Sequence, residues 1–192
     1  NDLGANETSG DQKRLDPLLM GTRTSLNVLG QAYLQYQNPW LKVDVGNLLL
    51  NTPWMGPADA FMIPNTYQAV TATLHPLPDL SIIAIREFRY KNRIQADYHR
   101  QTLLNYNAHY SYLPDNSDGT LAFGIKGQKL GIKATAWFYR FHDLTNMFYG
   151  TVGYTTPVLF QHFQPFADFQ YAREWADGAQ LAGPVNATVY GG

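Results

Sequence analysis

Cysteine is absent from this chain of 192 residues, which excludes disulfide bonds, thiol catalysis and cysteine-based zinc sites. Long apolar runs are also missing, because no stretch approaches the about 18 residues that a membrane-spanning helix needs. A helical membrane protein is therefore excluded. Charged residues make up only 15% of the chain, against about 25% in an average soluble domain, and the net charge is −1. A balance this close to neutral indicates no nucleic-acid partner.

Enzyme signatures are missing as well. The chain has no nucleophile elbow, P-loop or glycine-rich dinucleotide motif. Its histidines fall in no H-x-x-x-H or HExxH spacing; they are His75, His99, His109, His142 and His162. We therefore expect a protein that is not an enzyme, with no catalytic residue, no metal and no cofactor. Residues 1–13 are polar and lack the charged and apolar regions of a signal peptide, so none is expected in this stretch.

The chain does contain many aromatic residues, at 14%, and segments in which apolar and polar side chains alternate. Residues 40–48, for example, place Leu41, Val43 and Val45 on one face and Lys42 on the other, which is typical of a half-buried strand. Alternation predicts strands over 26–37, 40–48, 66–75, 80–90, 119–126, 129–142, 147–154 and 158–173, with 103–113 as a further candidate. Turns are predicted at 38–39, at the two prolines of 75–79 and at 127–128.

Two classes of β-protein fit this pattern. A mean hydropathy of −0.30 is compatible with a transmembrane barrel, whose strands alternate apolar and polar residues. Aromatic residues near the predicted strand ends would then form two belts at the membrane interfaces. The same composition also fits a soluble or envelope β-barrel or β-sandwich that binds a ligand without transport.

Several sequence blocks occur in the order of one known family. They are GNLLLNTP (46–53), MIPNTYQA (62–69), LPDLSI (77–82), WFYRFHD (137–143) with MFY (147–149), and GAQLAG (178–183). Together these blocks resemble the OprD-type outer-membrane porins of Gram-negative bacteria, which are carboxylate and amino-acid channels.

The resemblance implies an all-β fold, an antiparallel transmembrane β-barrel of which this chain forms about half of the roughly 18 strands. It implies one domain over 1–192, with outer loops at 1–24 and 92–117 and a constriction-type loop at 51–65. The implied function is a substrate-selective passive diffusion channel in the outer membrane for small polar solutes such as amino acids, small carboxylates or peptides. The implied partners are those solutes, outer-membrane lipid and lipopolysaccharide, with a homo-oligomer left open.

Charged and polar residues on strand faces are expected to line the pore, because an Arg or Lys facing the middle of the bilayer costs about 2–4 kcal/mol. Lys42 and Asp44 are expected to share one face, and Glu87 and Arg89 another. The alternative is that these groups are solvated residues of a soluble sheet or of loops. The full set of expected pore-lining residues is Lys42, Asp44, Glu87, Arg89, Arg140, His142, Asp168 and Gln170.

The loop at 51–65 inherits the constriction role from the resemblance. Family members often carry Ser-Arg where this chain has Ala60-Phe61, so Phe61 removes a cation from the expected constriction. A more apolar or more cation-tolerant constriction is then as plausible as a carboxylate-selective one. The constriction residues are expected to be Asn51, Thr52, Trp54, Asp59 and Phe61.

Overall fold

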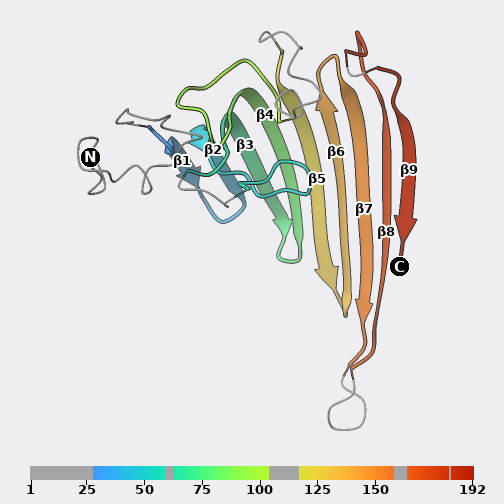
Figure 1. Cartoon of the computed structure of the whole chain (residues 1–192). Helices are drawn as coiled ribbons and strands as arrows, with labels where there is room; N and C mark the ends of the chain where they lie inside the picture. Colours follow the sequence, from blue (N-terminus) through green and yellow to red (C-terminus); the bar gives the residue numbers. More distant parts are fainter. Residues whose placement is uncertain (1–27, 59–62, 104–116, 158–163, 182) are drawn as a thin grey trace, which may run out of the picture.

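The computed structural model describes residues 28–58, 63–103, 117–157, 164–181 and 183–192. Within these ranges every regular element is a strand, and nine strands form one sheet in chain order, each antiparallel to its neighbours (Figure 1). None of these residues belongs to a helix that could cross a membrane. The strands are β1 (Ala32–Gln37), β2 (Leu41–Leu48), β3 (Thr66–Leu77), β4 (Leu80–Lys91), β5 (Thr120–Lys129), β6 (Ile132–Phe141), β7 (Thr145–Thr155), β8 (Phe166–Ala176) and β9 (Asn186–Gly191).

The predicted turn between β5 and β6 is wrong by three residues. Gly127 and Gln128 lie inside β5 and pair with β6, and the chain reverses at Leu130 and Gly131. Both turn residues have positive φ, 51° and 81°, as a two-residue hairpin turn of this hand requires. A Cβ on Gly131 would collide with the carbonyl oxygen of Thr155, so only glycine fits there.

Other strand boundaries also differ from the prediction. β3 continues through Pro76 to Leu77, and the register shifts between Leu74 and Leu77, because proline has no N–H to donate. β8 begins at Phe166 rather than at 158, and β9 was not predicted. The predicted outer loop 1–24 and nearly all of the predicted strand 103–113 lie outside the described residues.

A β-bulge in β4 separates two side chains that the sequence placed together. Ala69 pairs with Glu87 and Gln68 pairs with Arg89, so Phe88 is an extra residue without a partner on β3. Since the extra residue breaks the two-residue alternation, Glu87 and Arg89 point to opposite faces of the sheet. The prediction that they share a face is therefore wrong.

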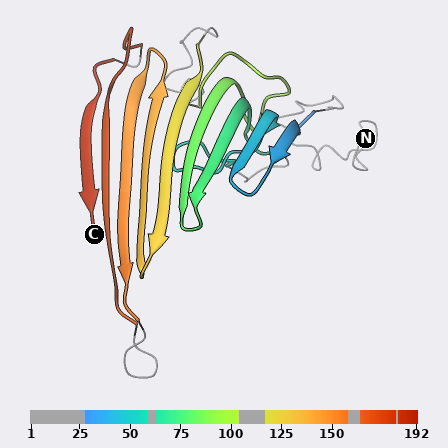
Figure 2. The same cartoon turned by 180° about the vertical axis from the view of Figure 1, so that it is seen from behind.

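The two faces of the sheet differ in character. The sheet is curved, as Figures 1 and 2 show. Its inner, concave face carries polar side chains and a buried cluster that includes Tyr67, Trp137 and Tyr139. The outer face carries mostly apolar side chains, many of them exposed. Its exposed members include Leu34, Tyr36, Val45, Leu74, Ile82, Phe123, Ile125, Ile132, Val152, Tyr154, Phe169 and Tyr190.

The two ends of the sheet differ in their connections. At the end that we call the loop rim, strands are joined by 49–65, 92–119, 142–144 and 177–185. At the opposite end, the turn rim, they are joined by 38–40, 78–79, 130–131 and 156–165. Three of the four connections at the loop rim are long, whereas three of the four at the turn rim are tight.

Candidate functional site

One long connection at the loop rim folds onto the inner face of the sheet. The segment after β2 crosses in front of β3 and β4 instead of projecting away from the strands, as both views show (Figures 1 and 2). A turn holds its tip, in which the amide of Thr52 donates to the carbonyl oxygen of Met55 at 3.0 Å. Met55 is completely buried, which fixes this turn against the wall. We call residues 51–58 the inward loop.

Aromatic side chains hold the inward loop from both sides. The Tyr67 hydroxyl on β3 donates to the carbonyl oxygen of Gly56 at 2.9 Å. On the other side, Trp54 packs edge-on against Tyr149 of β7, with ring centroids 6.1 Å apart. Tyr139 of β6 lies against the loop at Trp54. The loop is thus attached to strands that are far apart in the sheet.

The predicted constriction residues are only partly visible. Asn51, Thr52 and Trp54 lie in the inward loop, with Asn51 and Trp54 exposed and Thr52 half-buried in the turn with Met55. Asp59 and Phe61 lie outside the described residues, as does the substitution at Ala60-Phe61 on which the selectivity argument rests.

Lys42 and Asp44 lie together on the inner face of β2, as the alternation predicted. The Lys42 ammonium and the Asp44 carboxylate are 3.1 Å apart. Asp44 also accepts a 2.7 Å hydrogen bond from the amide of Gln35 and a longer one, 3.5 Å, from the hydroxyl of Thr71. Both charges therefore have partners, and the pair presents a fixed dipole rather than a free charge.

Asp168 and Gln170 lie on the inner face of β8, opposite their neighbours Phe169 and Tyr171. Both are exposed. The hydroxyl of Tyr149 lies 3.3 Å from the Gln170 amide oxygen and donates to it. Asp168 pairs with Gly153, whose missing side chain leaves room for the carboxylate.

The other predicted pore-lining residues are not exposed on the inner face. Glu87 is on the inner face but fully buried, and neither carboxylate oxygen has a hydrogen-bond partner among the described residues. Arg89 is exposed on the outer face, because of the bulge at Phe88. Arg140 is also on the outer face, since it pairs with Leu121 and alternates with the inward-facing Tyr139 and Phe141. His142 lies in the turn after β6 at the loop rim.

Two lysines on the inner face were missed in the sequence. Lys126 of β5 and Lys133 of β6 are exposed and lie on the same face as Gln170, beside the turn rim. The Lys126 ammonium lies 5.4 Å from the centre of the Trp137 ring, a cation–π contact. Their alternation with Ile125 and Ile132 was a signal that could have revealed them.

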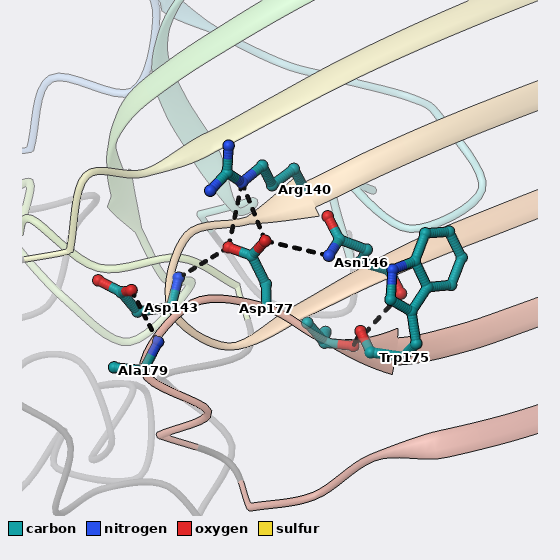
Figure 3. Close-up of polar contacts among 7 residues, drawn as sticks. Arg140, Asp143, Asn146, Trp175, Asp177 and Ala179 are labelled. Carbon is teal, nitrogen blue, oxygen red and sulfur yellow. Dashed lines mark hydrogen bonds and ion pairs between the residues drawn. The ribbon is translucent and has the colours of Figure 1, made fainter.

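Arg140 belongs to a polar cluster at the loop rim, drawn in Figure 3, which joins the turn after β6 to the segment after β8. Its Nε lies 3.0 and 3.1 Å from the two carboxylate oxygens of Asp177. Asp177 also accepts from the amide of Asn146 at 3.0 Å and from the Asp143 N–H at 3.2 Å. Partial burial raises the pKa of Asp177, but these hydrogen bonds outweigh it and hold the pKa below its usual value.

The described residues contain no group of three side chains that could hold a metal ion. The inner face instead offers separated charges of both signs beside a loop that crosses in front of it. Such a surface can orient and select a passing polar solute by charge.

Comparison with protein-family models gives no match, and comparison with curated proteins gives none either. Solved structures do match. OccK1 (OpdK) of Pseudomonas aeruginosa aligns with a TM-score of 0.76 at 17% identity, over 92% of this chain and 47% of that one. OpdK with vanillate, from the same species, gives 0.71 at 18% over 82% and 40%, and OccAB2 of Acinetobacter baumannii gives 0.69 at 19% over 81% and 39%.

These likenesses define the fold as part of an antiparallel outer-membrane β-barrel. The matched structures are OprD-type porins, also called Occ channels, so the resemblance seen in the sequence is confirmed at the level of the fold. The chain spans less than half the length of each of these three proteins.

Proposed function

We propose that this chain is part of an outer-membrane porin that forms a selective passive channel for small polar solutes. The observation that carries the proposal is the inward loop, tied to β3 by Tyr67 and to β7 by Trp54 across the inner face. A loop held there narrows the space that the sheet encloses. The fold shared with Occ channels supports the same reading.

The two faces of the sheet support a location in the outer membrane of a Gram-negative bacterium. Between Ile132 and Arg140 the outer positions of β6 carry only apolar residues, over about 26 Å of strand, which at the usual tilt of about 40° corresponds to about 20 Å of height. Outer-membrane barrels carry an apolar band about 25 Å tall on the face toward lipid. In this proposal the inner face lines the water-filled channel and the outer face contacts lipid.

The solutes proposed are small and carry charge or strong dipoles. Lys126 and Lys133 stand on β5 and β6, whereas Asp168 stands on β8, so charges of opposite sign line different parts of the wall. A transverse field of this kind orients zwitterions such as amino acids, and the lysines favour carboxylates. Asn51, Thr52 and Trp54 would contribute the constriction contacts.

The test is conductance of the full-length protein that contains this chain, reconstituted in a planar lipid bilayer. Discrete, long-lived current steps in potassium chloride are expected, together with swelling of protein-containing vesicles in solutions of amino acids or small carboxylates. Recovery of the protein in the aqueous fraction without detergent, with no current steps, would instead favour the ligand-binding β-protein of the alternative interpretation.

A further inference from the structure

Arginines gather on the outer face at the loop rim. Arg86 and Arg140 lie in one row of paired residues, two strands apart, with Leu121 between them. Arg89 lies nearer the rim on β4, and Arg173 occupies an outer position of β8. Below them, the outer positions of β4 to β8 carry no charge until Lys129 at the turn rim. The outer face therefore has a basic belt, Arg86, Arg89, Arg140 and Arg173, above an apolar surface.

The arginine of β8 is available for a further contact. No described acid lies within ion-pair distance of Arg173, which is exposed, and its guanidinium lies 5.7 Å from the centre of the Trp175 ring. In the row above, Arg140 makes both of its hydrogen bonds to Asp177 through Nε, as Figure 3 shows. Arginine binds phosphate through paired N–H groups.

Two grooves on the same face share Tyr171 as a lining residue, below Arg173. The upper groove, about 510 Å³, is lined by Arg173, Trp175, Phe148 and Tyr171 together with the start of β9. The lower one, about 390 Å³, shares Tyr171 and continues into the apolar surface. The lower groove includes Gly150, which has no side chain to fill it. Its other lining residues include Ile125, Ala136, Val152 and Phe169.

We propose that this double groove binds one lipid, with a phosphate on Arg173 and an acyl chain along Gly150. The inference rests on the proposed function, because it requires the outer face to lie in a membrane. Long connections mark the external side of outer-membrane barrels, so the loop rim faces outward and the lipid belongs to the external leaflet. The occupant is then a phosphorylated, multiply acylated glycolipid, the membrane anchor of lipopolysaccharide.

Charge complementarity and depth both favour this occupant. The arginine lies where the apolar surface ends, which is the depth of a headgroup phosphate. A zwitterionic phospholipid would bring its own ammonium to the same place and gain less from Arg173. Inorganic phosphate would meet the arginine but leave the apolar groove empty.

Native mass spectrometry of the full-length protein in detergent, titrated with diphosphorylated lipid A, measures the binding directly. Arg173→Gln should weaken the binding about fivefold, the value expected for one basic residue at an anionic membrane surface. Lys129→Gln, the matched control on the outer face at the opposite rim, should leave the affinity unchanged. Equal losses in both variants, or no loss in Arg173→Gln, would overturn the headgroup assignment.

A substitution at Gly150 tests whether the lower groove holds the acyl chain. A Cβ at Gly150 meets the nearest atom, on the Phe148 ring, at 3.5 Å, so a side chain can be accepted there. Gly150→Leu should fill the lower groove and reduce lipid A binding at least fivefold, whereas Ala72→Leu, on the outer face of β3, should not. Unchanged binding in Gly150→Leu, or competition by inorganic phosphate at the concentration of the lipid, would overturn the proposal of a lipid groove.

Conductance recorded from the same preparations separates this inference from the function on which it rests. Current steps in wild type and in both groove variants, with lipid binding reduced in the variants alone, support both proposals. If lipid binding falls in the groove variants but the protein gives no current steps, the channel proposal is contradicted and the lipid proposal is supported.

Discussion

The Trp54 indole stands edge-on to the Tyr149 ring, with centroids 6.1 Å apart and planes at 80°. The two residues are far apart in the sequence, and their contact joins the inward loop to β7. An aromatic pair of this kind contributes about 0.5–1.5 kcal/mol beyond the area it buries. Its removal tests whether the inward loop narrows a channel.

Trp54→Ala should free the tip of the inward loop and raise both the single-channel conductance and the open-channel noise. The loss of about 1 kcal/mol corresponds to an about fivefold increase in the detached fraction of the loop. Trp40→Ala is the control, since Trp40 is exposed and lies at the turn rim. Currents identical to wild type in size and noise would show that this contact does not hold a constriction.

Gly124→Ala should destabilise the barrel by about 1–3 kcal/mol, because a Cβ at this position would approach the Trp137 ring to 2.7 Å. Gly127→Ala on the same strand is the matched control, since its Cβ would meet nothing closer than 3.7 Å. Urea unfolding in lipid vesicles, followed by tryptophan fluorescence, measures both. Equal unfolding midpoints for the two variants would mean that Trp137 moves aside without cost.

Lys126→Glu should shift the ion selectivity toward cations, because it reverses an exposed charge on the inner face. Lys129→Glu, three residues along the same strand, places the same charge change on the outer face and should leave the selectivity unaltered. Reversal potentials across a salt gradient report the difference. A shift of the same size in both variants would contradict the assignment of the faces.

Labelling of single cysteines is a second test of which side chains lie on the inner and outer faces. This chain has no native cysteine that would also react. A membrane-impermeant thiol reagent should modify Lys42→Cys and Asp44→Cys faster than Val43→Cys in the membrane-embedded full-length protein. Fastest labelling at position 43 would reverse the faces of β2.

Acid should weaken the cluster at the loop rim. Since hydrogen bonds hold the pKa of Asp177 below its usual value near 4, its contribution to stability is complete above about pH 4 and is lost as the pH falls through the lowered pKa. Asp177→Asn should therefore cost about 1–3 kcal/mol at neutral pH and flatten the stability profile in acid. Asp168→Asn is the control, and an acid profile unchanged in Asp177→Asn would contradict the role of this carboxylate.

The sequence predicted the strands best where alternation was strict, as in β2, where Lys42 and Asp44 fall on the inner face. It failed where one residue breaks the period. Phe88 is such a residue, because nothing in the local sequence distinguishes a bulge from a regular strand, and Arg89 was placed on the wrong face. The hairpin turn was misplaced at Gly127 because its geometry depends on positive φ at Leu130 as well as at a glycine.

Site residues were harder to predict because the sequence does not show how near the rim of the sheet a charged residue on a strand lies. Arg140 was assigned to the pore because an arginine facing hydrocarbon is costly. The structure places it on the outer face at the rim, where Asp177 binds it and the cost does not arise. The contacts of the inward loop with Tyr67 and Tyr149 join distant segments, and no local pattern encodes them.

The meander order of the strands bears on how the protein folds. Each strand pairs with the one made just before it, so β1 to β9 can add one at a time as hairpins close. The inward loop is different, because Trp54 needs Tyr149, which lies four connections later in the chain. Before β7 is in place, ordering the chain between Trp54 and Tyr149 costs conformational entropy that the aromatic contact does not yet offset. Docking of the inward loop is therefore a late folding event. The loop does not cover the inner face until β6 and β7 have joined the sheet.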